Sequence, residues 1–116
     1  MNKLLVFLAL LTCAFTANSN TVYTADELEE MIISEAYPKT LQSRLISDST
    51  GAGSFDECVS MMKGIIDKAE DYPSLVERNS FGVFRAKLWD SDGLYELNCV
   101  EANDSVIAEQ YKAEYK

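Results

Sequence analysis

The side chains that could do chemistry in this sequence are its cysteines and its closely spaced acids, because the chain contains no histidine. The lack of histidine removes the commonest general base, the Ser-His and Cys-His nucleophile pairs, and the usual zinc ligand sets. If Cys58 and Cys99 form a disulfide, a thiolate nucleophile and an all-cysteine metal site are excluded as well. We therefore predict no catalytic residues, no metal site and no cofactor, and we do not expect an enzyme.

Paired carboxylates are the remaining catalytic option, since two of them can hydrolyse a glycosidic bond. Asp90 and Asp92 are the closest pair, and Glu96 and Glu101 follow them. Their surroundings favour a hairpin turn, in which Asp bonds to nearby backbone groups. The run Asp90-x-Asp92-Gly93 also departs from a calcium loop, which needs its glycine at position six. A hydrolase that uses two of these four acids stays open as the least favoured alternative.

Residues 1–19 have the features of a cleaved export signal: Lys3, a largely apolar run, and then small residues. We predict cleavage after Ser19, with cleavage after Ala14 as the alternative, and both cuts remove Cys13. The residues that end at Cys13 loosely match a lipobox, so a lipidated cysteine and an uncleaved anchor stay open.

Cleavage after Ser19 leaves residues 20–116, which we expect to form a single domain in a secreted or periplasmic setting. This region holds nine basic and nineteen acidic residues, a formal charge of −10. Such a charge repels nucleic acid and anionic membrane surfaces and attracts a cationic partner. The alternative is that the acidity only keeps an exported protein soluble.

Two capping boxes mark the starts of two helices, each with a hydroxyl residue and a glutamate three positions later. They are Thr24 with Glu27 and Ser54 with Glu57. The first predicts a helix from Ala25 to Ala36, and the second predicts the main helix, from Phe55 to Asp71. Between them we expect a short helix that begins near Pro38, followed by a loop over residues 47–53.

After Ser80 the apolar period changes from 3.6 residues to two, which predicts a β-hairpin. Asp92-Gly93 is a preferred two-residue turn, and a turn there sets Leu88 opposite Leu97. One face then holds the apolar set Phe84, Ala86, Leu88, Tyr95, Leu97 and Cys99. We interpret residues 105–116 as a third strand, with a helix as the alternative.

Cys58 lies on the apolar stripe of the main helix, and Cys99 lies on the apolar face of the hairpin. Both cysteines therefore fall in the interface between helix and sheet, which predicts a disulfide that joins them. The predicted fold class is α+β: N-terminal helices packed on a small antiparallel meander of two to three strands, with one helix-to-strand disulfide.

The opposite hairpin face holds the candidate partner-binding residues Trp89, Arg85, Lys87 and Glu96, because a Trp with a neighbouring Arg is typical of a binding hot spot. In the alternative interpretation the tail or an N-terminal segment covers Trp89, and Lys87 pairs with Glu96.

The preferred function is protein–protein binding, as an inhibitor, an immunity-type protein or an envelope accessory protein, with a cationic enzyme as the expected kind of partner. We predict no nucleic-acid partner and no stable membrane insertion after cleavage. The main alternative is a carrier of a small apolar ligand, with a cavity lined by Met31, Met62, Phe84 and Leu97.

Overall fold

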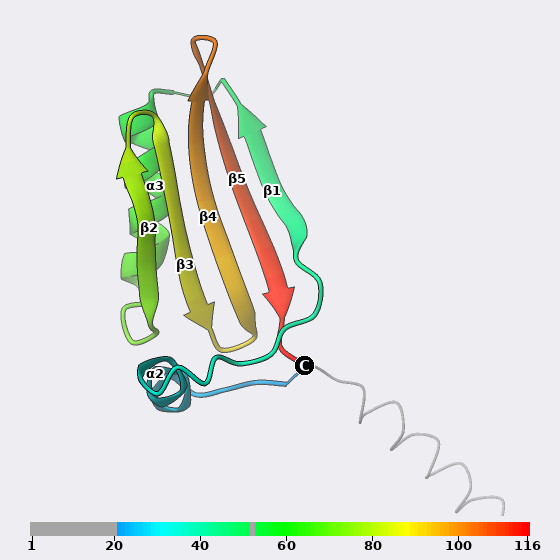
Figure 1. Cartoon of the computed structure of the whole chain (residues 1–116). Helices are drawn as coiled ribbons and strands as arrows, with labels where there is room; N and C mark the ends of the chain where they lie inside the picture. The colour runs from blue at the N-terminus through cyan, green and yellow to red at the C-terminus, as the bar shows by residue number, and fades with distance from the viewer. Residues whose placement is uncertain (1–20, 52) are drawn as a thin grey trace, which may run out of the picture.

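The computed structural model describes residues 21–51 and 53–116. The predicted export signal, both cleavage positions and Cys13 lie outside the described residues. The described part contains two helices and five strands (Figure 1). In chain order they are α2 (Ala25–Ile33), β1 (Arg44–Thr50), α3 (Phe55–Lys68), β2 (Ser74–Ser80), β3 (Val83–Asp90), β4 (Gly93–Ala102) and β5 (Ser105–Glu114).

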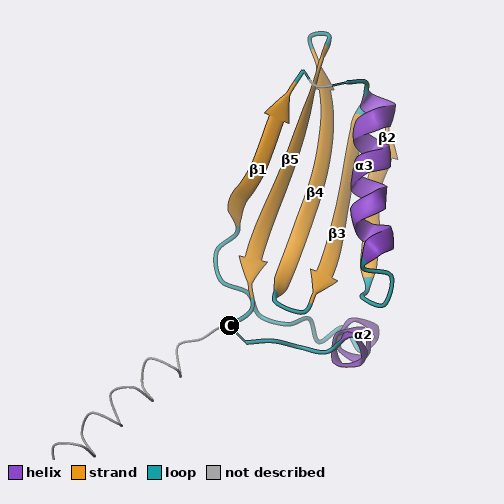
Figure 2. Ribbon diagram, turned by 180° about the vertical axis from the view of Figure 1, so that it is seen from behind, coloured by secondary structure: helices purple, strands orange, loops and turns teal. Residues whose placement is uncertain are grey.

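The five strands form one antiparallel sheet in the order β1-β5-β4-β3-β2. Helix α3 lies along one face of this sheet, and α2 lies beyond the sheet's end (Figure 2). The α+β class with a helix-to-strand disulfide is therefore confirmed in outline. Two details were wrong: the sheet has five strands instead of two or three, and the helices are not all N-terminal, because β1 lies between them.

The two strands that the sequence did not predict are the edge strands of the sheet. The short helix expected near Pro38 is absent from the described residues, and Arg44–Thr50 instead pairs with β5. Every residue of β1 and of β2 is exposed. Neither segment buries a face, so neither needs an alternating apolar pattern. Each forms a strand by hydrogen bonding to its neighbour in the sheet.

Both capping boxes are present and set the starts of the helices as predicted. In α2 the Thr24 hydroxyl accepts from the Glu27 amide at 3.2 Å, and the Glu27 carboxylate accepts from the Thr24 amide at 3.0 Å. The far ends are shorter than predicted. Helix α2 ends at Ile33, and Glu35 just beyond it has φ +60°, a left-handed value that stops the helix.

The β3–β4 turn lies one position earlier than predicted, at Ser91-Asp92, with Asp90 paired to Gly93. Leu88 therefore faces Tyr95 instead of Leu97. This change moves the pairing by two residues, which leaves every side chain on its predicted face. Gly93 is the first residue of β4, and a Cβ there would lie 2.8 Å from the carbonyl oxygen of Ala113. The glycine permits this close approach of β4 to β5.

The main core joins α3 to the sheet and contains the predicted disulfide. Cys58 and Cys99 are bonded, with their Cα atoms 6.1 Å apart. We call this cluster the disulfide core; its buried residues are Cys58, Val59, Met62, Phe84, Ala86, Leu97, Cys99, Val106 and Ala108. Val106 and Ala108 belong to β5, so the tail is a strand, as the preferred interpretation had it.

A second, smaller cluster joins α2 to the end of the sheet. Its buried residues are Leu28, Trp89 and Tyr115, and its partly buried members are Tyr23, Ile32, Tyr72 and Leu94. We call it the end-cap cluster. Tyr23 and Leu28 flank the first turn of α2 at the two positions of a hydrophobic staple, and both belong to this cluster. Within the described residues, neither helix is long and apolar enough to cross a bilayer.

Candidate functional site

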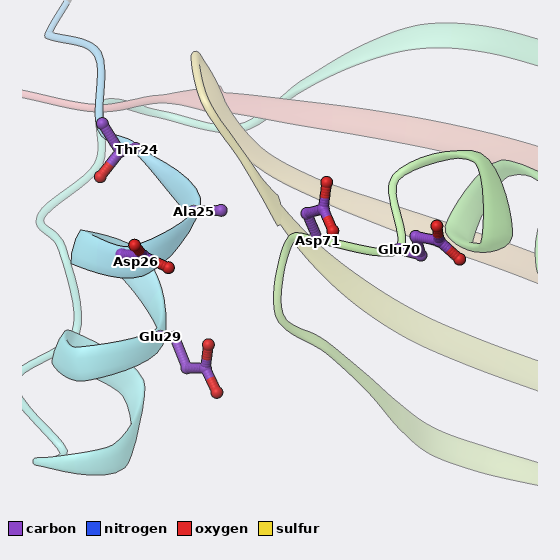
Figure 3. A pocket seen from close by; sticks show the side chains of 6 residues that line it. All are labelled: Thr24, Ala25, Asp26, Glu29, Glu70 and Asp71. Carbon is purple, nitrogen blue, oxygen red and sulfur yellow. The ribbon is translucent and has the colours of Figure 1, made fainter.

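A cleft of about 560 Å³ opens between the start of α2 and the loop that follows α3 (Figure 3). Four acidic side chains line it: Asp26 and Glu29 from α2, and Glu70 and Asp71 from the loop. Thr24 and Ala25 complete the lining. No basic residue belongs to this lining, and all four acids are exposed. We call this feature the acidic cleft.

Local sequence explains how α2 supplies one wall. The Thr24 capping box fixes the first turn, and Asp26 and Glu29 are three positions apart on the same side of the helix. Leu28, on another side, is fully buried in the end-cap cluster. Hydrogen bonds from the backbone and side chain of Thr24 lower the pKa of Glu27. Glu27 thus serves the helix start and does not line the cleft.

The loop of residues 69–73 supplies the other wall, and the backbone of β3 holds it in place. The amide of Tyr72 donates to the carbonyl of Ala69 at 2.9 Å, and the amide of Trp89 donates to the carbonyl of Pro73 at 3.0 Å. The α2 wall is tied nearby, because the Tyr23 amide donates to the Ser91 carbonyl at 3.0 Å. Both walls are therefore anchored at the same end of β3.

The four carboxylates of the acidic cleft produce a negative electrostatic potential over the cleft, but they are not arranged to coordinate a metal ion. No group of three or more His, Cys, Asp or Glu side chains in the described part of the chain is placed to hold a metal ion. The cleft therefore suits a broad cationic surface, such as lysine and arginine side chains of another protein.

The candidate partner-binding residues do not form one exposed surface. Trp89 is only 5% exposed, stacks with Tyr37 at a ring-centroid distance of 6.0 Å and packs in the end-cap cluster. The prediction that Trp89 is exposed was wrong. The N-terminal segment and Tyr115 cover it, as in the alternative interpretation. Burial of the Trp89 ring is favourable because the ring packs with the apolar side chains of Leu28 and Tyr115.

Arg85, Lys87 and Glu96 do lie together, on the sheet face opposite α3, which we call the outer face. They border a shallow depression of about 440 Å³. The ammonium of Lys87 lies 3.6 Å from the Glu77 carboxylate, so it has an edge-strand partner that the sequence interpretation missed. Whether these three residues bind a partner stays a prediction.

The outer face is acidic toward β1 and β5. Glu109 is paired directly with Asp48 across these strands, and the Tyr111 hydroxyl donates to the Glu109 carboxylate at 3.2 Å. The negative charge of Glu109, followed by burial, raises the pKa of Tyr111, and Glu96 and Asp48 add to this.

The four carboxylates proposed for hydrolysis are not gathered in one concave site. Asp90 and Asp92 flank the β3–β4 turn, whereas Glu101 is near the opposite end of β4. Glu96 points to the outer face, and Glu101 has the opposite parity along the strand. Asp90 accepts from the Ser91 amide at 2.7 Å, which is the turn role that the sequence favoured.

The residues proposed to line a ligand cavity are divided between two places. Met62, Phe84 and Leu97 are fully buried within the disulfide core. Met31 lies on α2, which packs at the end of the sheet with the end-cap cluster. The structure therefore does not bring this set together.

Sequence interpretation missed the acidic cleft. The available signal was the density of acids, because Asp26, Glu27, Glu29 and Glu30 fall within five positions and Glu70 adjoins Asp71. No family model matches the chain, and neither the curated proteins nor the solved structures include a significant match.

Proposed function

We propose that this chain is an exported binding protein that docks a cationic protein through its acidic cleft, as an inhibitor, an immunity-type protein or an envelope accessory protein. One observation carries the proposal: four exposed carboxylates from two distant segments line one open cleft, and no basic residue belongs to that lining. A cationic enzyme or toxin would find there a surface of opposite charge.

The charge of the whole chain supports the same kind of partner. Nineteen acidic residues outnumber ten basic ones, which gives a formal net charge of −9. A field of this sign raises the rate at which a cationic protein reaches the surface, and the cleft adds a local concentration of charge. Salt should weaken this attraction strongly, because the four carboxylates are exposed.

The mounting of the cleft also suits docking. Its two walls are tied by backbone hydrogen bonds to Trp89 and Ser91, which are two positions apart. Helix α3 behind the loop is fixed to β4 by the disulfide. A surface that is ordered before binding loses less conformational entropy when the complex forms.

The test compares two variants of equal charge made in the full, oxidised chain. The cleft variant carries Asp26→Asn, Glu29→Gln, Glu70→Gln and Asp71→Asn. The matched control carries Glu35→Gln, Asp48→Asn, Glu101→Gln and Asp104→Asn, four acids that do not line the cleft. A protein captured from an extract of the same compartment is purified, and its affinity for each chain is measured at about 0.05 M and 0.5 M salt.

We expect the cleft variant to bind about tenfold more weakly, or worse, at low salt, and the control to change by less than about threefold. Equal losses in the two variants would show that net charge, not the cleft, governs binding. Capture of no partner, or of one whose affinity ignores salt, would overturn the proposal.

A further inference from the structure

The tip of the β2–β3 hairpin carries an aromatic side chain in a position that brings the fold no packing. Phe81 is 98% exposed, the highest value among the large apolar residues of the described chain. Its backbone has φ +48°, a left-handed conformation that bulky residues rarely adopt, and Gly82 follows with φ +73°. Phe81 thus costs the folded state free energy in two ways: its apolar ring is exposed to water, and its backbone adopts a disfavoured conformation.

The β4–β5 hairpin offers a comparison, because its turn lies at the same end of the sheet. The β4–β5 turn also has two consecutive residues with positive φ, Asn103 at +50° and Asp104 at +64°. Asn and Asp tolerate this conformation, because their side chains can bond to the local backbone. At the first position of these two turns, one therefore carries a phenylalanine where the other carries a small polar residue that suits the conformation.

The Phe81 tip is held firmly. The amide of Glu101 on β4 donates to the carbonyl of Gly82 at 2.8 Å. A Cβ at Gly82 would lie 3.2 Å from the Cβ of Glu101, so the tip rests directly against β4. The ring is accordingly presented from an ordered backbone, which lowers the entropy lost on binding.

Two arginines below the tip share a second unfavourable feature. Arg78 of β2 and Arg85 of β3 are directly paired across the hairpin, and both are exposed. Like charges in such a pair repel each other. Among the described residues, neither arginine takes part in a salt bridge; those present involve Arg44, Lys87 and Lys112. The pair lies about 10 Å from the tip, within reach of one contact surface.

We infer that Phe81, Arg78 and Arg85 form a second docking surface, which inserts the phenyl ring into an apolar pocket rimmed by carboxylates on a protein partner. The free arginine charges select the acidic rim, and aromatic and arginine residues are the usual anchors of interfaces. A membrane fits less well, because a single ring gives little insertion and the chain is strongly acidic. The β2–β3 turn lies at the opposite end of β3 from α2 (Figure 1), and this surface shares no residue with the lining of the acidic cleft.

The first arm of the test asks whether Phe81 serves stability. The full, oxidised chain with Phe81→Asn is melted beside the wild type and beside Ile33→Asn, a control at another residue that is 75% exposed. We expect the melting temperature of Phe81→Asn to be equal or higher, because Asn suits a positive φ. A lower melting temperature would assign Phe81 a structural role and overturn the inference.

The second arm identifies what the ring contacts. The photoreactive analogue p-benzoylphenylalanine replaces Phe81 in one chain and Ile33 in another, and each is irradiated in an extract of its compartment. We expect a protein adduct from position 81 alone, mapped to an apolar site flanked by Asp or Glu and reduced at least about fivefold by Arg78→Gln with Arg85→Gln. Adducts that ignore these arginines, equal adducts from position 33, or none at all would overturn it.

The third arm distinguishes a protein partner from a lipid membrane. Vesicles of phosphatidylcholine with about 30% phosphatidylglycerol are mixed with wild type and Phe81→Asn, and co-sedimentation is measured. Binding that needs Phe81 would assign the tip to membranes and overturn a protein partner; no binding is the expected result. The Phe81→Asn chain keeps an intact acidic cleft, so failure here leaves the proposed function standing, and failure of the cleft variant leaves this inference standing.

Discussion

The disulfide core and the end-cap cluster bury apolar side chains in the same small protein by different means. The core joins one helix to neighbouring strands and is crosslinked by Cys58 and Cys99. The end cap gathers only three buried residues, Leu28, Trp89 and Tyr115, from three distant parts of the chain. The end cap buries fewer apolar side chains than the core and is held in addition by hydrogen bonds. One of them runs from the Tyr115 hydroxyl, which donates to the Asp90 carbonyl at 2.6 Å.

The two ends of the molecule should therefore differ in local stability. Elements with few buried contacts open at lower free energy than the core, and they often carry binding surfaces. The end cap supplies one wall of the acidic cleft and the cover of Trp89. We therefore expect the end cap to open while the disulfide core stays folded, and the chain's single tryptophan reports that opening.

The largest expected effect comes from removing the crosslink of the core. The two cysteines are 41 positions apart, and a loop of that size corresponds to about 4 kcal/mol in the chain-entropy model. The double substitution Cys58→Ser with Cys99→Ser should lower the free energy of unfolding in urea by about this amount. Reduction of the wild-type chain should give a similar value, and a loss below about 1 kcal/mol would show that the core does not rely on its crosslink.

The second effect, of about 3 kcal/mol, should be confined to the end cap. Leu28→Ala leaves a cavity beside Trp89, and loss of a fully buried leucine costs about 2–5 kcal/mol. The matched core substitution is Met62→Ala, which also removes a fully buried side chain. Acrylamide quenching of Trp89 in the folded state should rise for Leu28→Ala and stay low for Met62→Ala.

Global unfolding in urea supplies the control for this pair. Met62→Ala should lower its free energy by about 2–5 kcal/mol, whereas Leu28→Ala should lower it by less, because the cap can open first. Equal quenching in the two variants would mean that the molecule unfolds as one unit and that the end cap has no separate opening.

The capping boxes give the closest matched pair across the two regions, with an expected effect of about 1 kcal/mol each. Thr24→Ala removes the hydroxyl that accepts from Glu27, and Ser54→Ala removes the one that accepts from Glu57 at 3.1 Å. Hydrogen exchange should show faster exchange in α2 alone for Thr24→Ala. Ser54→Ala should instead raise exchange throughout α3 and β4, and the reverse pattern would contradict the assignment of stabilities.

The sequence predicted the disulfide core better than the end cap, for a physical reason. The stripe of α3 and the alternation of β3 and β4 are local patterns, so Cys58 and Cys99 could be brought together by pattern alone. The pairing of β3 with β4 was misjudged by two residues, which side-chain alternation cannot detect. Strands β1 and β2 escaped notice because exposed edge strands bury no face.

The candidate site was harder to predict because its walls come from segments about forty positions apart. The local density of acids around Asp26 and Glu29 was a signal that the sequence interpretation did not use. Only the docking of Leu28 against Trp89 and Tyr115 places these acids opposite Asp71. The same docking buries Trp89, which the sequence placed on a polar face because its neighbours Arg85 and Lys87 are charged. Burial by a distant segment has no signature in the hairpin itself.

The smallest expected effect concerns the ion pair of Asp92 and Lys112, below about 1 kcal/mol because Asp92 is 43% exposed. The ammonium of Lys112 donates to the Asp92 carboxylate at 2.7 Å, and the Tyr95 hydroxyl donates to it at 3.1 Å. Burial raises the pKa of Asp92, but these two hydrogen bonds, the positive charge of Lys112 and a backbone hydrogen bond together leave the pKa below its ordinary value. The hydrogen bond to Asp92 raises the pKa of Lys112.

The two directions define a window of pH. Asp92 binds its proton more weakly in the folded state, so its stabilisation is present above about pH 4 and is lost as the pH falls through its lowered pKa. Lys112 holds its proton more tightly when folded, so its stabilisation is present below about pH 10 and is lost as the pH rises through its raised pKa. Because the pair ties the β3–β4 turn beside Ser91, this dependence should appear in Trp89 quenching. Asp92→Asn should flatten the acid side and also weaken the alkaline side, because the hydrogen bond to Asp92 is the main cause of the raised pKa of Lys112. An unchanged acid limb would assign the end cap's pH dependence to other groups.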